Sequence, residues 1–396
     1  MVVPQDRLFH HNFFYSLFKL QKSLNKVIIG GIIGAVAIGV IVSAFLFSAN
    51  FSLIQPSYHN EKLGLIINPP SNKITLDDFQ NYYTQASSTG IGRTNLYLFW
   101  NLIEPEKENY DWKQSDLWMN FNKKHDLKVT LYFSIINGKT LGPFPSWIGK
   151  PSLSSISADS LVKVLDSILT RYEPIDTVII AGETEEYFRY SEQNIPVYKD
   201  LFNSIYASLK EKHPDVKFGN AFSLHGIINK NLSHIVEQLD VGDFVAFSYF
   251  PVDSLNEINK TPQEARKDLE TIMTLVPDKK KGIFEISWST SDFVNGTEVE
   301  QTEFIKNVYD FYRTNESQLE FVTWYRQFDR PEEACVMTPE KTEGQISIGD
   351  SGLGSSEFVI ERLNHYICNA GLIDINGNKK PAWNEFTKQV QMNTNS

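Results

Sequence analysis

The chain has 396 residues, of which 41% are hydrophobic and 21% charged, and its formal net charge is −11. This composition is typical of a globular protein and excludes a disordered or collagen-like chain. The negative charge argues against sequence-independent binding of nucleic acid, which needs clustered Lys and Arg side chains. Two cysteines are too few for a disulfide-stapled scaffold or a zinc site made of four thiolates.

The first part of the chain predicts a membrane anchor. Residues 27–49 carry no charged side chain, and as a helix they would measure roughly 34 Å, which is enough to cross a bilayer. Residues 1–26 hold four basic side chains against one acidic side chain, so we expect this segment to be cytoplasmic and the rest to be extracellular. A cleaved signal peptide is the alternative, but its apolar core is only about 7–15 residues long.

After a linker at 50–57, short β-branched or aromatic runs alternate with longer amphipathic stretches. The runs predicted to be strands are 63–67, 94–99, 128–133, 177–181, 216–221, 244–249, 282–286 and 321–325. Helical periodicity lies between them, for example in 160–172 and 197–213. Eight repeats of strand and helix predict an α/β fold, the (β/α)8 barrel, over residues 58–390, followed by a tail at 391–396.

Other architectures and other kinds of site find little support in the sequence. An open doubly wound sheet would need a glycine-rich phosphate turn after its first strand, where this chain has Asn68, Pro69 and Pro70. The histidines form no HxxxH pair, and no Gly-x-Ser-x-Gly turn follows a predicted strand. We therefore expect no metal and no cofactor.

Two carboxylates stand at predicted strand ends, Glu183 after the fourth strand and Glu285 in the seventh. In such barrels chemistry gathers where strands end, and strands four and seven face each other across the ring. Two carboxyl groups across a cleft are what glycosidic bond cleavage needs, because one protonates the leaving oxygen and the other attacks the anomeric carbon. The alternative is that each carboxylate is solvated or paired with a nearby Arg.

Aromatic residues at the same predicted strand ends are candidates for sugar binding. Their rings would pack on the apolar faces of sugars, and core packing is the alternative for each of them. The candidates are Trp100, Tyr187, Tyr249, Trp288 and Trp324.

The segments around these positions resemble the glycoside hydrolases of clan A. Residues 100–112 (WNLIEPEKENYDW) are similar to the stretch W-x-x-[IL]-E-P-x-x-G-x-Y-x-[WF] after strand two, with Glu108 in place of Gly. Residues 284–290 (FEISWST) are similar to the nucleophile strand E-[IVF]-G-[WFY]-[PS]-[ST]. The segments 371–374 and 380–383 resemble the closing G-L-x-D and K-P-A-W of several such enzymes.

This resemblance implies a (β/α)8 enzyme that hydrolyses O-glycosyl bonds of oligo- or polysaccharides with retention. It maps the nucleophile onto Glu285 and the acid/base onto Glu183, whose pKa should be raised by the second carboxyl. It also maps Trp324 onto the tryptophan that floors the −1 sugar site. Glu185 is the alternative acid and a candidate substrate contact, because it would share a face of an extended strand with Glu183.

One departure from the family pattern bears on activity. Gly182 stands where the family has an Asn that hydrogen-bonds the sugar 2-hydroxyl. A weak or inactive carbohydrate-binding surface protein is therefore the alternative function, and an envelope protein that uses the barrel as a scaffold is a third.

The two cysteines, Cys335 and Cys368, are candidates for a disulfide in an oxidising exterior. Two unpaired thiols are the alternative.

Overall fold

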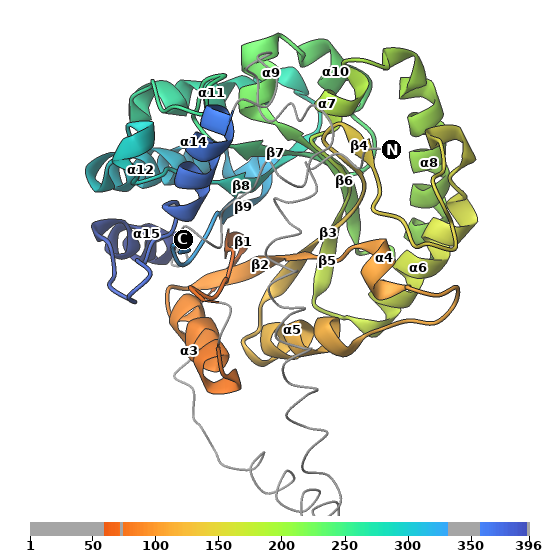
Figure 1. Ribbon diagram of the computed structural model, residues 1–396, viewed down its shortest axis with the longest axis horizontal. Coiled ribbons are helices and arrows are strands. Elements are labelled where there is room, and N and C mark those ends of the chain that lie inside the picture. The colour runs from red at the N-terminus through yellow and green to blue at the C-terminus, as the bar shows by residue number, and fades with distance from the viewer. Residues whose placement is uncertain (1–58, 72–73, 332–356, 394–396) are drawn as a thin grey trace, which may run out of the picture.

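The computed structural model describes residues 59–71, 74–331 and 357–393, which contain a closed barrel of parallel strands surrounded by helices (Figure 1). Neighbouring strands pair in the order β2-β1-β9-β8-β7-β6-β5-β3, and a further pairing of β2 with β3 closes the ring. The barrel strands are β1 (Asn60–Leu65), β2 (Ile91–Tyr97), β3 (Lys128–Asn137), β5 (Ile175–Gly182), β6 (Lys217–Ser223), β7 (Phe244–Tyr249), β8 (Lys280–Ile286) and β9 (Leu319–Trp324). The predicted (β/α)8 barrel is confirmed, and the doubly wound alternative is wrong.

Each predicted strand overlaps one strand of the barrel, but β3 is longer than expected. It runs on to Asn137, where a short antiparallel strand, β4 (Thr140–Leu141), folds back on it. This extension carries two additional polar residues of β3, Ser134 and Asn137, toward the carboxyl rim of the barrel.

The helices form the outer layer around the strands (Figure 1). The longer ones are α3 (Leu76–Ser87), α5 (Lys113–Lys124), α6 (Ala158–Arg171), α8 (Ile195–Lys212), α11 (Pro262–Leu275), α12 (Glu298–Asn315), α14 (Glu357–Cys368) and α15 (Pro381–Met392). Shorter turns of helix are α4 (Trp100–Ile103), α7 (Thr184–Phe188), α9 (Leu224–Lys230) and α10 (Ser233–Gln238), with 3-10 turns η2 (Leu153–Ser155), η3 (Glu192–Asn194), η4 (Asp292–Val294) and η5 (Glu316–Gln318).

Local sequence explains where these helices begin and which face they bury. Thr75 and Thr261 start α3 and α11 as reciprocal capping boxes with Asp78 and Glu264, which satisfies backbone N–H groups of the first turn. On α6 the residues at i, i+3, i+4 and i+7 from Leu161 are fully buried against the barrel, as the periodicity predicted.

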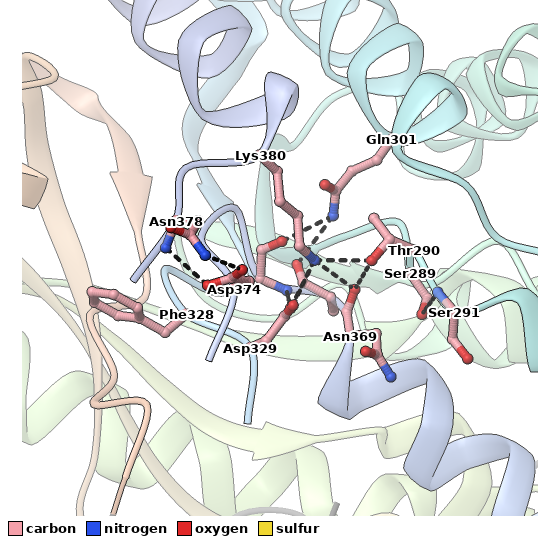
Figure 2. A network of polar contacts seen from close by, with 12 residues as sticks. Ser289, Thr290, Ser291, Gln301, Phe328, Asp329, Asn369, Asp374, Asn378 and Lys380 are labelled. Atoms are coloured by element: carbon pink, nitrogen blue, oxygen red, sulfur yellow. Dashed lines mark hydrogen bonds and ion pairs between the residues drawn. The ribbon is translucent and has the colours of Figure 1, made fainter. Parts of the chain in front are cut away.

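The closing segment ties the last two barrel strands together through a buried lysine (Figure 2). The Lys380 ammonium lies 2.7 Å from an Asp329 carboxylate oxygen, and it donates to the Thr290 hydroxyl at 2.9 Å. The other oxygen of Asp329 accepts from the Gly371 backbone N–H at 2.8 Å. Because Thr290 follows β8 and Asp329 follows β9, this network holds both loops against the segment before α15. Gly371 and Lys380, which belong to the two segments that resemble the closing part of the family, are thus both members of this buried network.

Several sequence predictions fall outside the described residues. The anchor at 27–49, the basic segment 1–26, the linker at 50–57 and Cys335 all lie there, so the predicted topology and disulfide stay predictions. Among the helices that the structure does describe, none is both long and apolar enough to cross a membrane.

Candidate active site

Glu285 lies inside the barrel near the end of β8, and its side chain is 6% exposed. The Tyr97 hydroxyl on β2 donates a hydrogen bond to its Oε1 atom. Burial raises the pKa of Glu285 to about 7, while the Tyr97 hydrogen bond and the positive charge of Arg326 act in the opposite direction. The Tyr97 hydroxyl and the Arg326 guanidinium therefore favour the ionised form of Glu285, whereas burial of the carboxyl group favours its neutral form.

A break in the strand register explains how Glu285 comes to face inward. Phe247 of β7 pairs with Ile283, but the next residue, Ser248, pairs with Glu285, so Phe284 is an extra residue in β8. The Phe284 ring contacts the rings of Tyr97 and Tyr132, at centroid distances of 5.7 and 5.4 Å, so it also lies inside the barrel.

Glu183 is exposed at the carboxyl rim, directly after β5 and before α7. Its backbone has φ 48° and ψ 45°, the left-handed region, which costs a non-glycine residue roughly 1–2 kcal/mol. Backbone strain of this kind is concentrated at functional sites, where the side chain must be aimed in a particular direction.

Glu185 does not share a strand face with Glu183, because the chain has entered α7 between them. Its carboxyl group is fully buried, and one oxygen accepts from the Ser223 backbone N–H on β6 at 3.1 Å. Burial, and then the charges of Glu186 and Glu183, raises the pKa of Glu185 well above its usual range. The extended geometry assumed for this pair is wrong, and Glu185 is directed toward β6.

Tyr132 on β3 connects the carboxylates of this region. Burial raises the pKa of its hydroxyl, a hydrogen bond with Ser134 lowers it, and the charges of Glu183, Glu285 and Glu185 raise it further. Its ring is stacked on Phe284 of β8, and its hydroxyl lies beside Gly182 at the end of β5. Residues from β3, β5 and β8 thereby meet at one end of the barrel. The prediction that proximity would raise the pKa of Glu183 stays a prediction, since the raised value here belongs to Glu285 and has burial as its main cause.

Three predicted sugar-binding aromatics lie in the layer between barrel and helices. The rings of Tyr249, Trp288 and Trp324 all pack on Phe304 of α12, with centroids 6.3, 5.2 and 6.1 Å away. The Tyr249 hydroxyl donates to Asp268 of α11 at 2.5 Å. These side chains therefore point outward, and their assignment to a sugar-binding surface at the barrel mouth is wrong. Strand alternation is the physical reason, because neighbouring residues point to opposite faces.

Trp100 and Tyr187 remain on the rim side but differ in burial. Trp100 is buried, donates from its indole N–H to Glu104 at 2.7 Å, and packs its ring near Phe133 and Trp147. It therefore stabilises the loop after β2. Tyr187 on α7 is only half-buried, so its position still fits a contact with substrate.

Sequence reasoning missed the inward-facing neighbours of Glu285. These are Tyr97 on β2, Tyr132 on β3, and the pair Tyr325 and Arg326 after β9, in which the guanidinium donates to the Tyr325 hydroxyl at 2.6 Å. Burial raises the pKa of Tyr325, the charge of Arg326 lowers it, and the charge of Glu285 raises it further. Tyr325, one residue after Trp324, occupies the inward position that we had expected of the tryptophan.

In the described parts of the chain, no three or more His, Cys, Asp or Glu side chains are grouped so that they could hold a metal ion.

Comparison with known proteins gives structural matches only. No protein-family model and no curated sequence matches the chain. The structure is similar to a GH5_18 glycoside hydrolase from Streptomyces cattleya in complex with Manb1-4GlcNAc, with 11% identity over 84% of this chain and 80% of that one and a TM-score of 0.60.

Two further similar structures belong to other glycoside hydrolase families. A family 39 glycoside hydrolase from Bacteroides cellulosilyticus WH2 has 16% identity over 85% of this chain and 64% of that one, with a TM-score of 0.56. Xylanase 10B from Thermotoga maritima has 14% identity over 84% and 95%, with a TM-score of 0.53. At such identities the similarity establishes the fold, and this chain has the (β/α)8 barrel found in these glycoside hydrolases.

Proposed function

We propose that this protein is a retaining β-glycoside hydrolase in which Glu285 is the nucleophile and Glu183 the acid/base. The observation that carries the proposal is the setting of Glu285, a buried carboxyl at the end of the seventh barrel strand that accepts from Tyr97 and faces the Arg326 charge. The glycoside hydrolases with the same barrel fold support it, as does the sequence resemblance around residues 284–290.

In the proposed first step, the ionised Glu285 attacks the anomeric carbon while Glu183 gives its proton to the leaving oxygen. The C–O bond to the leaving group breaks, and a glycosyl ester forms on Glu285. In the second step Glu183 takes a proton from water, whose oxygen attacks the anomeric carbon and releases Glu285. Tyr97 and Arg326 stabilise the carboxylate before attack and after release.

A carbohydrate-binding protein with little or no turnover is the second candidate. The absence of the strand-four amide at Gly182 is the observation that favours it. Binding of oligosaccharide without release of product would distinguish this function from hydrolysis.

Glu183→Ala tests the role of the acid/base. The variant should lose far more activity on glycosides with poor leaving groups than on activated aryl glycosides, since only the former need the proton. Because azide can attack the glycosyl ester without a general base, it should restore turnover of the aryl glycoside and give a β-glycosyl azide. Release of aryl alcohol and product analysis by NMR measure both effects.

Glu192→Ala on η3 is the matched control, since Glu192 is likewise an exposed carboxylate one short segment away. It should retain the activity of the parent protein on both kinds of glycoside. Equal activity of the Glu183→Ala variant and the parent on poor leaving groups would contradict the assignment.

We also propose that residues 27–49 anchor the barrel to the cell membrane with residues 1–26 in the cytoplasm. The charge-free run and the basic residues that precede it are the support for this location. Protease added to intact cells should release a fragment that begins near residues 50–60 and contains the barrel. Protection of the barrel while exposed control proteins are digested would contradict this topology.

A further inference from the structure

The extra residue of β8, Phe284, lies immediately before the proposed nucleophile. The pairing of β8 with β7 skips Phe284 altogether. On the other side, β9 has the single residue Thr323 where β8 has two, Phe284 and Glu285. A bulge of this kind leaves the extra residue outside the ladder and bends the strand. The conformation of Phe284 therefore depends on contacts from outside the two neighbouring strands.

An asparagine from across the barrel makes such a contact. The Asn95 side-chain amide on β2 donates to the Phe284 carbonyl at 2.6 Å, and both residues are buried. Since β1 and β9 lie between β2 and β8 in the ring, this bond crosses the barrel interior. The Oδ1 atom of the same amide is buried and has no hydrogen-bond partner among the described residues. A half-satisfied buried amide costs stability, so Asn95 is unfavourable as a core residue and its place here indicates another role.

The same face of β2 also holds the carboxyl group of the proposed nucleophile. Tyr97 comes two residues after Asn95, and its hydroxyl donates to the Oε1 atom of Glu285. The Tyr97 ring contacts the Phe284 ring, with centroids 5.7 Å apart. Two residues of β2 thus contact the backbone of the extra residue, its ring and the carboxyl group that follows it. Because the bulge sets the side to which Glu285 points, both contacts act on the same orientation.

We propose that Asn95 is a positioning residue for the nucleophile. Its bond to the Phe284 carbonyl holds the extra residue of β8 in the conformation that directs the Glu285 carboxyl group to the Tyr97 hydroxyl. In this role Asn95 acts on the reaction only through Glu285. The inference rests on the proposed glycoside hydrolase activity and deepens it, because it names the residue that aims the nucleophile.

Asn95→Leu tests this role, because leucine has about the same size but no hydrogen-bond donor. The acid limb of the pH dependence of kcat/KM reports the ionisation of Glu285 in the free enzyme. If the carboxyl group loses the Tyr97 hydrogen bond, its pKa rises, so the acid limb should move up by about one pH unit. Above the limb, kcat/KM for an activated aryl β-glycoside should fall by about 10- to 100-fold, since a misplacement of about 1 Å has an effect of this order.

The other titratable groups that interact with Glu285 are kept in this variant. They are the Arg326 guanidinium and the Tyr132 and Tyr325 hydroxyls, besides Tyr97 itself. Asn95 carries no charge, so a moved acid limb reports a changed setting of the Glu285 carboxyl group.

A second substitution separates a positioning effect from a structural one. Tyr97→Phe removes the hydroxyl to which Glu285 is directed, so it should move the acid limb in the same direction. In the double variant Asn95→Leu has no Tyr97 bond left to break, and the limb should stay where Tyr97→Phe alone places it. An acid limb that does not move in Asn95→Leu, or shifts that add in the double variant, would overturn the inference while leaving the proposed function intact.

Asn220→Leu on β6 is the matched control. Asn220 is likewise a buried asparagine of a barrel strand, but its Oδ1 atom accepts from the Tyr198 hydroxyl of α8 at 2.6 Å. This variant should keep the acid limb and the kcat/KM of the parent protein. If urea unfolding shows that Asn95→Leu is not folded, Asn95→Ala takes its place with the same expected shift. A parent protein that cleaves no glycoside would instead overturn the proposed function and this inference with it.

Discussion

Replacing Glu285 by Gln is expected to lower kcat by at least about 10⁴-fold, because the variant keeps the shape of the side chain but has no nucleophilic oxygen. Release of aryl alcohol from an activated glycoside measures this loss. The activated leaving group matters, since it makes the first step independent of proton donation by Glu183. Activity within about tenfold of the parent protein would contradict the role of Glu285.

The same substitution should change stability in a pH-dependent way, which also shows that the variant is folded. The pKa of Glu285 is about 7 in the folded protein and ordinarily 4.5, so the folded state holds this proton more tightly than the unfolded state. Stability from this group is present below pH 4.5 and is lost as the pH rises through about 7. Above that pH the loss amounts to about 3 kcal/mol, which Glu285→Gln should regain.

Urea unfolding at about pH 8 and about pH 4 measures this difference. Glu285→Gln should be the more stable protein at the higher pH, and the two should be similar at the lower pH. Glu211→Gln, at an exposed carboxylate on α8, is the control and should change stability little at either pH. A Glu285→Gln variant that is no more stable than the parent at the higher pH would show that the carboxyl is not desolvated as the structure has it.

Lys380→Met should lower the free energy of unfolding by about 3–5 kcal/mol, the cost of leaving a buried charge without its partner. Lys380 and Asp329 are both almost completely buried, and their charged atoms are 2.7 Å apart (Figure 2). Burial raises the pKa of Asp329 and Lys380 opposes this effect, so without the lysine the aspartate will take up a proton more readily. The destabilisation should therefore become smaller as the pH falls.

Lys388→Met is the control for this substitution. Lys388 pairs with Glu385 at 3.7 Å on α15, and its side chain is 63% exposed. A surface pair of this kind contributes at most about 1 kcal/mol, so the control should unfold close to the parent protein. If the two variants lost equal stability, the Lys380 network would not be what holds the loops after β8 and β9.

The fold was predictable because its signal repeats along the chain. Each apolar or aromatic run forms one strand of the barrel. In β5 the consecutive residues Val178, Ile179 and Ile180 are all fully buried, as expected for a strand that is covered on both faces. The extension of β3 to Asn137 was missed because Ser134 and Asn137 are polar and read as the start of a loop. They are buried all the same, through hydrogen bonds within the rim.

The orientation of side chains at strand ends was much harder to predict. In strands covered on both faces, inward and outward positions are equally apolar, so Trp324 and Tyr325 could not be told apart by hydropathy. The extra residue at Phe284 adds to the difficulty, because it shifts the alternation within β8. The pairing of Gly182 with Tyr132 was also beyond sequence reasoning, since it joins residues on two strands through a contact that only the fold creates.

The departures from the family pattern have physical explanations of different kinds. Glu108 stands where the family has Gly and adopts φ 63°, so the left-handed turn is kept without the glycine. Gly182 stands where the family has Asn, and there the neighbouring Tyr132 has taken up the space. The first departure concerns only the loop after β2, whereas the second concerns the region around the proposed nucleophile.

The most direct test of the central claim is to trap the covalent intermediate and locate it. A 2-deoxy-2-fluoro β-glycoside with an activated leaving group forms the glycosyl ester faster than water removes it, so the ester should accumulate. Mass spectrometry of the intact protein should then show one added sugar, and peptide mapping should place it on Glu285. A sugar attached to another carboxylate, or hydrolysis with inversion and no covalent adduct, would contradict the account.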